Sequence, residues 1–210
     1  NANKEAQNIK SAQNGFTVMP YTFSELDDKI NEAYKKVCYE HDFIQSISTS
    51  VKPVVLSKPW TYTHIAGVYT FFTGEANINT NFPEYTLPFT VAHEMAHQRG
   101  ISREEEANFV AFLVCTASDD AYIRYSGYLS VYEYVSSALY SADSEAYYTV
   151  LADLSGKVRG ELIAFSKFFD EYRDSTASQV VESVQDVYLQ QQGQTQGSRS
   201  YNLVTDLAVA

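Results

Sequence analysis

The sequence has few cysteines, few basic residues and no long apolar run. Its two cysteines, Cys38 and Cys115, exclude a disulfide-dense scaffold and a zinc site built from four cysteines. No stretch reaches the roughly eighteen apolar residues that span a bilayer, and no signal peptide is present. Fifteen Lys+Arg stand against 26 Asp+Glu, a formal net charge of −11. The basic footprint of a nucleic-acid binder is therefore missing, and adhesion of this domain to an anionic membrane surface is disfavoured.

What is present is enough for a packed core. The chain has 210 residues, of which 45% are hydrophobic, and we predict a single domain over residues 1–210. Residues 1–15 are polar and rich in Gln and Asn, so we expect a frayed entry segment. The chain begins at Asn1-Ala2 without Met and ends in the apolar run 203–210, so we interpret it as an excerpt from a longer protein.

Hydrophobic periodicity and turn residues predict an α+β fold with a small antiparallel sheet and a mainly helical body. Ser24 is expected to cap the first long helix, and Gly100, Gly156 and Gly193 are expected to end later ones. Strand-favouring residues occur at 51, 54–56, 68–72 and 76–79. The predicted helices cover residues 25–41, 87–99, 103–117, 119–141, 144–156, 160–174 and 177–191.

One segment carries recognisable chemistry: His93-Glu94-Met95-Ala96-His97. On a helix, residues four apart share a face, so both imidazoles can bind one metal ion, and neutral imidazole suits Zn²⁺. Glu94 follows the first ligand, where a general base for a zinc-activated water is needed. With 4 His in 210 residues, random placement gives this pattern in about 0.5% of such chains. The sequence therefore predicts one zinc ion on this helix.

The third ligand is expected from the next helix. A metzincin would have His at position 103, where this chain has Arg103. Glu104 falls on the same stripe as Asn108, four residues later, so we predict that Glu104 binds the metal and that Asn108 hydrogen-bonds a ligand. Because helix phase is uncertain by a residue, Glu106 remains an alternative ligand.

Two further interpretations of this segment stay open. Ser102 and Glu105 match a capping box, which would give Glu105 a structural role. The three consecutive glutamates could also form no more than a solvated acidic cap. The lone histidines His41 and His64 are weaker ligand candidates.

These paired segments resemble the gluzincin pattern, in which a second helix carries a ligand Glu and a supporting Asp or Asn. Residues 72–79, 87–100, 104–109 and 197–207 together resemble the family called domain of unknown function 3810. The resemblance implies a zincin-like two-helix site in a membrane-anchored zinc peptidase. It also implies a location at the extracytoplasmic face of a bacterial cell membrane, with the anchoring segments outside this sequence. It implies no particular substrate beyond a peptide or protein.

Two more roles are predicted around the metal. Residues Ala76, Asn77 and Ile78 are expected to form an edge strand whose backbone pairs with an extended peptide substrate, although an ordinary strand or turn is an equal alternative. An oxyanion stabiliser is also needed. The family's C-terminal segment ends near Tyr201, which makes it the first candidate, ahead of Arg199, Tyr69 and His64. The tyrosines between Tyr122 and Tyr148 are interpreted mainly as half-buried core.

The sequence thus favours zinc-dependent peptide hydrolysis, with Glu94 as catalytic base and His93, His97 and Glu104 as metal ligands. The main alternative is a zinc-bearing sensor or peptide-binding module of the cell envelope that has no turnover. The intact Glu94 argues against this alternative, since a binder needs no base. A structural zinc site is a third hypothesis, and it requires a fourth protein ligand.

Overall fold

The computed structural model describes residues 1–173, and the predicted helix over 177–191 lies outside the described residues. Helices dominate this range, and the predicted α+β class is confirmed. The helices and strands are α1 (Ala2–Ala6), α2 (Phe23–Glu40), β1 (Val51–Pro53), α3 (Ser57–Thr61), β2 (Gly67–Thr70), β3 (Glu75–Ile78), the 3-10 turn η1 (Glu84–Thr86), α4 (Leu87–Gln98), α5 (Glu104–Ala117), α6 (Ala121–Ala142), α7 (Ser144–Asp153) and α8 (Gly156–Asp170).

The sheet has the strand order β1-β3-β2 and is mixed, so the predicted all-antiparallel sheet is wrong. Strands β2 and β3 form an antiparallel hairpin, in which Tyr69 lies opposite Ala76. Strand β1 instead pairs with β3 in parallel, with Val51 opposite Ala76. Strands β1 and β3 are parallel because of the connection between them. After β1 the chain passes through α3 and returns along β2, so β3 begins at the same end of the sheet as β1.

The prediction that Ala76, Asn77 and Ile78 form an edge strand is also wrong. They lie in β3, the central strand, and each has a partner residue on both neighbours. Ala76 and Ile78 are buried in the core. With β1 on one side and β2 on the other, β3 has no free edge at which a peptide could add as a strand.

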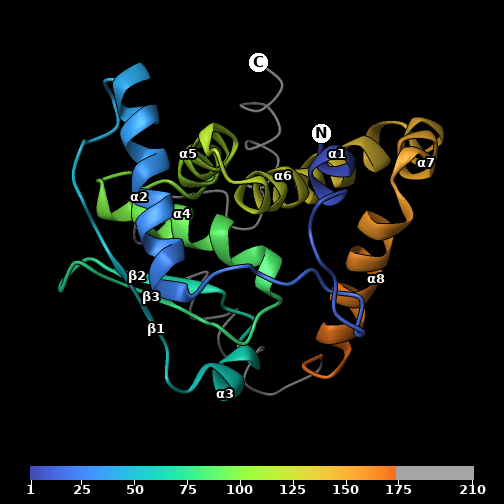
Figure 1. The fold of residues 1–210 in the computed structure, drawn as a ribbon, viewed down its shortest axis with the longest axis horizontal. Coiled ribbons are helices and arrows are strands. Elements are labelled where there is room, and N and C mark those ends of the chain that lie inside the picture. Colours follow the sequence, from blue (N-terminus) through green and yellow to red (C-terminus); the bar gives the residue numbers. More distant parts are fainter. Residues whose placement is uncertain (174–210) are drawn as a thin grey trace.

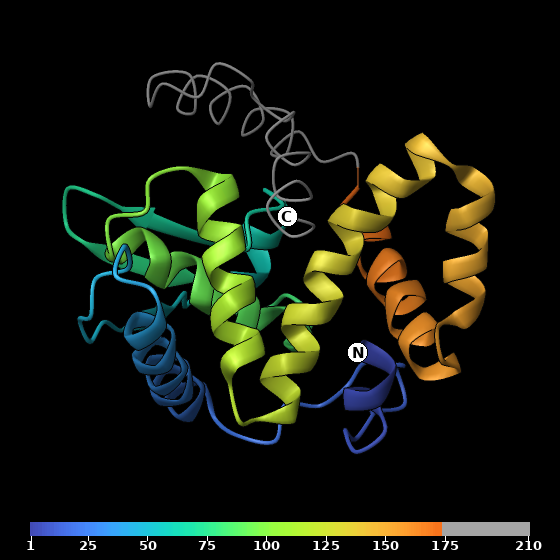
Figure 2. The same cartoon turned by 90° about the horizontal axis from the view of Figure 1, so that it is seen from above.

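Helix α4 lies in the middle of the larger core cluster, between the sheet and helices α2 and α5 (Figure 1). Its first turns are buried throughout, from Leu87 to Ala92. A second cluster joins α1, α6 and α8. Helices α7 and α8 lie on the side of α6 away from the sheet (Figure 2). The residues of the predicted metal motif are therefore on a helix that is packed on several sides by the described core.

Helix α2 begins earlier than expected. The N-cap is Thr22 and not Ser24. The Thr22 hydroxyl accepts from the Glu25 amide, while the Glu25 carboxylate accepts from the Thr22 amide at 2.8 Å. This reciprocal capping box satisfies two amide groups at the helix start, which Ser24 could not do from inside the helix.

The N-terminal segment is packed, so the expectation of a frayed entry is wrong. Asn3 donates to the carbonyl of Asp153 and accepts from the amide of Ser155, each at 2.8 Å. Glu5 pairs with Arg124 of α6, also at 2.8 Å. These contacts attach α1 to α6 and to the turn between α7 and α8. Polar composition alone did not reveal them, because the partners lie more than a hundred residues away.

Two other boundaries differ from the prediction. Gly156 begins α8 and does not end a helix, because the Ser155 hydroxyl caps α8 by accepting from the Val158 amide. Residues 54–56, predicted as strand, lead into α3 as a turn. None of the helices in residues 1–173 combines the length and the apolar character needed to cross a membrane.

Candidate metal centre

The candidate metal centre is built on α4, the turn after it and the start of α5. Gly100 ends α4 as predicted, with a φ of 89° that favours glycine. The Gly100 amide donates to the carbonyl of His97, and the Ile101 amide donates to that of Ala96. This pair of bonds is a Schellman turn, and it reverses the chain so that α5 starts at Glu104, beside the histidines.

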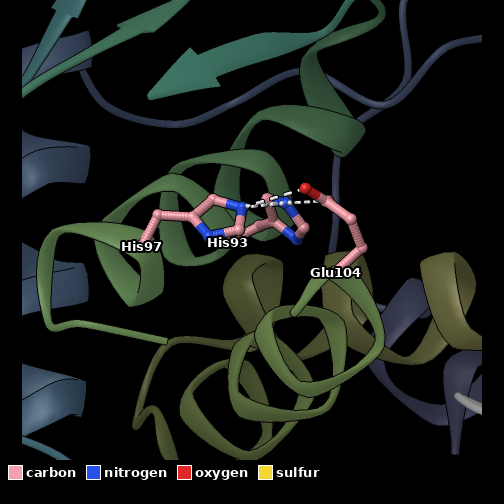
Figure 3. A group of neighbouring side chains, drawn as sticks. All are labelled: His93, His97 and Glu104. Atoms are coloured by element: carbon pink, nitrogen blue, oxygen red, sulfur yellow. Dashed lines mark hydrogen bonds and ion pairs between the residues drawn. The ribbon is translucent and has the colours of Figure 1, made fainter. Parts of the chain in front are cut away.

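The structure brings His93, His97 and Glu104 together, and their side chains point toward one another (Figure 3). The Nε2 atoms of the two histidines are 3.0 Å apart. Glu104 places one carboxylate oxygen 3.1 Å from Nε2 of His93 and the other 3.6 Å from Nε2 of His97. All donor atoms of the group lie within 4.8 Å of one another, so a single ion could contact all three.

Each imidazole is oriented through its other nitrogen. Nδ1 of His93 donates to the side-chain oxygen of Asn108 at 2.9 Å, which is the contact that the helix spacing predicts. Nδ1 of His97 donates to the carbonyl of Ile101 at 2.7 Å. Both acceptors are oxygens without a hydrogen, so both Nδ1 atoms carry the proton. Such outer partners fix the tautomer and the ring orientation of metal-binding histidines.

The donor set fits a cation. With Nδ1 protonated, a neutral imidazole presents the lone pair of Nε2, and here two such lone pairs face each other at 3.0 Å beside a carboxylate. Two lone pairs at that distance repel unless a positive charge lies between them. Two neutral imidazoles and one carboxylate are the ligands that Zn²⁺ takes in open three-ligand sites.

Glu94 lies on the turn between the two histidines but does not join their cluster. It is nearly buried, and its Oε2 atom is inaccessible and has no hydrogen-bond partner among the described residues. Burial raises the pKa of its carboxyl, although the charges of His93 and His97 act in the opposite direction. The carboxyl is thus close enough to interact with the histidines while one of its oxygens remains unused.

The three glutamates at the start of α5 have different roles. Burial alone would raise the pKa of Glu104, but the two imidazoles in contact with it hold this pKa well below its usual value. Glu105 is buried and pairs with Arg103, and Glu106 pairs with Arg103 at 3.4 Å. Arg103, not Ser102, is the N-cap, so the predicted capping box of Ser102 and Glu105 is wrong. Glu106 takes no part in the cluster of donors.

Strand β2 contributes a feature that the sequence analysis missed. A Cβ atom on Gly67 would lie 2.6 Å from Oε1 of Glu94, so the Glu94 side chain occupies the space that any other residue would need. Two residues later, the ring of Tyr69 stacks on that of His97, with 6.1 Å between the ring centroids. Gly67 and Tyr69 thus place β2 directly against the motif. The only signal in the sequence was a glycine at the start of a strand-like run.

Arg99 is a second residue that the sequence did not single out. It is 2% exposed, it donates to the hydroxyl of Thr49 and the carbonyl of Ile47 at 2.7 Å each, and it lies over the ring of Tyr34. A cation at the C-terminal end of α4 is also favoured by the helix dipole. Arg99 therefore fixes the end of α4, two residues after His97, to α2 and the loop before β1.

The remaining candidates are not at the centre. Tyr201 and Arg199 lie outside the described residues. Nε2 of His64 is bonded to the backbone carbonyl of Tyr172, and His41 packs against Phe43. Of the described candidates for an oxyanion stabiliser, Tyr69 is the one beside the metal motif. Cys115 is buried against Gly127 of α6, as expected for a small core residue, and neither cysteine is in a disulfide.

Comparison with known proteins identifies a family. A family model described as "Protein of unknown function (DUF3810)" matches residues 1–209. No curated protein matches the chain, and no solved structure matches it.

Proposed function

This chain belongs to the family of proteins of unknown function DUF3810, and from the geometry of its metal centre we propose that it is a zinc-dependent peptidase. The observation that carries the proposal is the convergence of His93, His97 and Glu104 next to a buried carboxylate, Glu94, with an oxygen that no described residue contacts by a hydrogen bond. The extracytoplasmic location expected from the family resemblance stays a prediction.

An open site is favoured over a structural one. Structural zinc sites are closed by four protein ligands, whereas catalytic sites have three and keep one position free. Within residues 1–173, the group of His, Cys, Asp and Glu side chains that could hold the ion contains these three residues and no fourth. The donor count therefore supports a catalytic site.

Glu94 is suited to the role of general base. When bound, zinc supplies a Lewis acid that polarises the scissile carbonyl and lowers the pKa of a water molecule. The Glu94 carboxylate, beside the two histidines, can accept the proton of the attacking water and then deliver it to the leaving amine. Burial raises the pKa of this carboxyl, which makes it a stronger base than an exposed glutamate. With zinc bound, His93 and His97 would not act as bases, since Nδ1 of each already carries a proton and the Nε2 lone pairs would be taken by the ion.

Strand β2 supports a peptide as substrate. It is the edge strand nearest to Glu94 and His97, and in the described sheet only its β3 side is paired. An extended peptide that adds to a free strand edge gains main-chain hydrogen bonds without a requirement for particular side chains. A peptide on β2 would pass beside the metal centre, which a peptide next to the buried strand β3 could not do.

Gly67→Ala is expected to lower the rate of peptide hydrolysis by at least about tenfold while zinc content stays unchanged. The new Cβ would lie 2.6 Å from the Glu94 carboxylate and force it to move, and a shift of about 1 Å at a catalytic group can cost up to about a hundredfold in rate. The backbone of Gly67 has no positive φ, so alanine itself fits. Steady-state kinetics and metal analysis measure the effect.

The matched control is Gly160→Ala in α8, where an added Cβ meets no atom within 4 Å. It should leave both activity and zinc content unchanged. If Gly67→Ala is as active as the wild type, Glu94 does not work from its position against β2.

The proposed function is tested by metal analysis and a peptide-library digestion. We expect one zinc ion per chain and cleavage that stops on chelation and returns with one equivalent of zinc. His97→Ala should lose the zinc, and His41→Ala, on a histidine outside the centre, should keep it. Zinc binding without cleavage of any peptide would favour the non-catalytic binding module instead. Absence of zinc binding would overturn both hypotheses.

A further inference from the structure

A cavity of about 700 Å³ lies between α6, α7 and α8, among the helices on the side of α6 away from the sheet. Its walls are mainly aromatic and aliphatic and include Tyr132, Tyr147, Tyr148 and Phe165. This volume is within the range of pockets that hold small organic ligands, about 300–1,000 Å³. The tyrosines that the sequence predicts as core therefore do not all share one role. Tyr122 and Tyr125 are buried in the core, whereas Tyr132, Tyr147 and Tyr148 line this cavity.

One acidic side chain lies in the cavity wall. Glu133 accepts a hydrogen bond from the Tyr85 hydroxyl at 3.2 Å through Oε1, and its Oε2 makes no hydrogen bond to any described residue. Burial raises the pKa of this carboxyl to about 7, while the bond from Tyr85 acts in the opposite direction. A partly buried carboxylate with one neutral partner is stabilised in its charged form when a positive group approaches it.

The aromatic rings in the same wall as Glu133 also favour a positively charged ligand. The ring centroids of Tyr147 and Tyr148 are 5.3 Å apart at an interplanar angle of 72°, and Tyr132 of α6 lies in the same cavity wall. The hydroxyl of Tyr132 is inaccessible and has no hydrogen-bond partner in the described part of the chain. Faces of tyrosine rings attract organic cations, and a carboxylate beside several rings strengthens this attraction.

The one basic residue in the cavity wall, Arg159, does not cancel the attraction of Glu133 for a cation. Arg159 is exposed to solvent, so its charge is screened, and it forms no ion pair with a residue of the described chain. The Glu133 side chain is less exposed than that of Arg159, so its charge is less screened by solvent.

We propose that the cavity between α6, α7 and α8 binds an organic ammonium ion with an apolar or aromatic body. The ammonium group lies against Glu133 and the rings of Tyr132 and Tyr147, and the apolar body packs along Leu162 and Phe165. This site is separate from the zinc centre, and the proposal does not depend on peptidase activity.

The test is a calorimetric titration of the full chain with benzyltrimethylammonium at about pH 8, where the Glu133 carboxyl is mostly ionised. Glu133→Gln keeps the acceptor for Tyr85 and removes the charge, so we expect binding to weaken at least about tenfold, and Tyr147→Leu should weaken it about fivefold. The matched control is Glu145→Gln, an exposed acid of α7 outside the cavity wall, which should bind like the wild type.

Two further probes separate charge from shape. Neopentylbenzene has the same shape without the charge, and phenylpropionate carries the opposite charge, so both should bind more weakly than the ammonium ion. Circular dichroism shows whether each variant is folded. The proposal is overturned if no ammonium binding is detected at millimolar concentration or if folded Glu133→Gln binds as tightly as the wild type. It is also overturned if either probe binds as tightly, because the cavity would then be merely apolar or governed by Arg159.

Discussion

Glu94→Gln is expected to keep one zinc ion per chain and to lose peptide hydrolysis by a factor of about 10²–10⁴, the usual contribution of a general base. Glutamine has the same shape as glutamate but cannot accept the proton of the attacking water. The side chain is not part of the donor cluster, so its replacement leaves His93, His97 and Glu104 in place. Metal analysis and steady-state kinetics on the most sensitive peptide of a library measure the two effects separately.

The control for this variant is Glu106→Gln. It removes a carboxylate from the first turn of α5, but that carboxylate is 46% exposed and paired with Arg103. We expect its activity and zinc content to equal those of the wild type. If Glu94→Gln hydrolyses peptides at the wild-type rate, Glu94 is not the base and the proposed mechanism is wrong.

Glu104→Gln is expected to weaken zinc binding by more than about a hundredfold. Loss of a residue that only supports a ligand already costs about 10–100-fold in metal affinity, and Glu104 supplies the donor itself. The variant also removes the one negative charge of the donor cluster. The two carboxylate oxygens of Glu104 lie 3.1 Å from Nε2 of His93 and 3.6 Å from Nε2 of His97. Competition with a fluorescent zinc chelator measures the change.

The comparison with Glu106→Gln decides between the two glutamates that helix phase alone left open. The structure directs Glu104 to the histidines and Glu106 to Arg103. Zinc affinity should therefore fall in Glu104→Gln and stay at the wild-type value in Glu106→Gln. The opposite result would mean that α5 is rotated about its axis, with Glu106 facing the histidines and Glu104 facing away from them.

The helical part of the site could be predicted because its information is local. Residues four apart on a helix share a face, so the sequence alone paired His93 with His97 and Glu104 with Asn108. Gly100 marked the turn that joins the two helices. The roles of Gly67 and Arg99 could not be predicted in this way, because both depend on contacts between elements that are far apart in the sequence.

The sheet shows the limit of local patterns more clearly. Strand-favouring residues predict where strands occur, but they do not determine the order of the strands in the sheet. Hairpin connection predicts that β2 and β3 pair, as they do, whereas the parallel pairing of β1 with β3 results from a crossover through α3. The two edge strands of the described sheet are β1 and β2, and Ala76–Ile78 lie between them. The N-terminal helix was missed for a similar reason, since its polar residues have distant partners.

The turn at Gly100 has a consequence for the order of assembly. Only eleven positions separate His93 from Glu104, and a loop this short has a low entropic cost of closure. Contacts between residues so close in sequence form early in folding. Pairings such as β1 with β3 form later, because a longer segment of chain has to be ordered between the two strands. The hairpin of α4 and α5 can thus gather its three donors ahead of the sheet. An ion captured at that stage would stabilise every later intermediate that retains the hairpin.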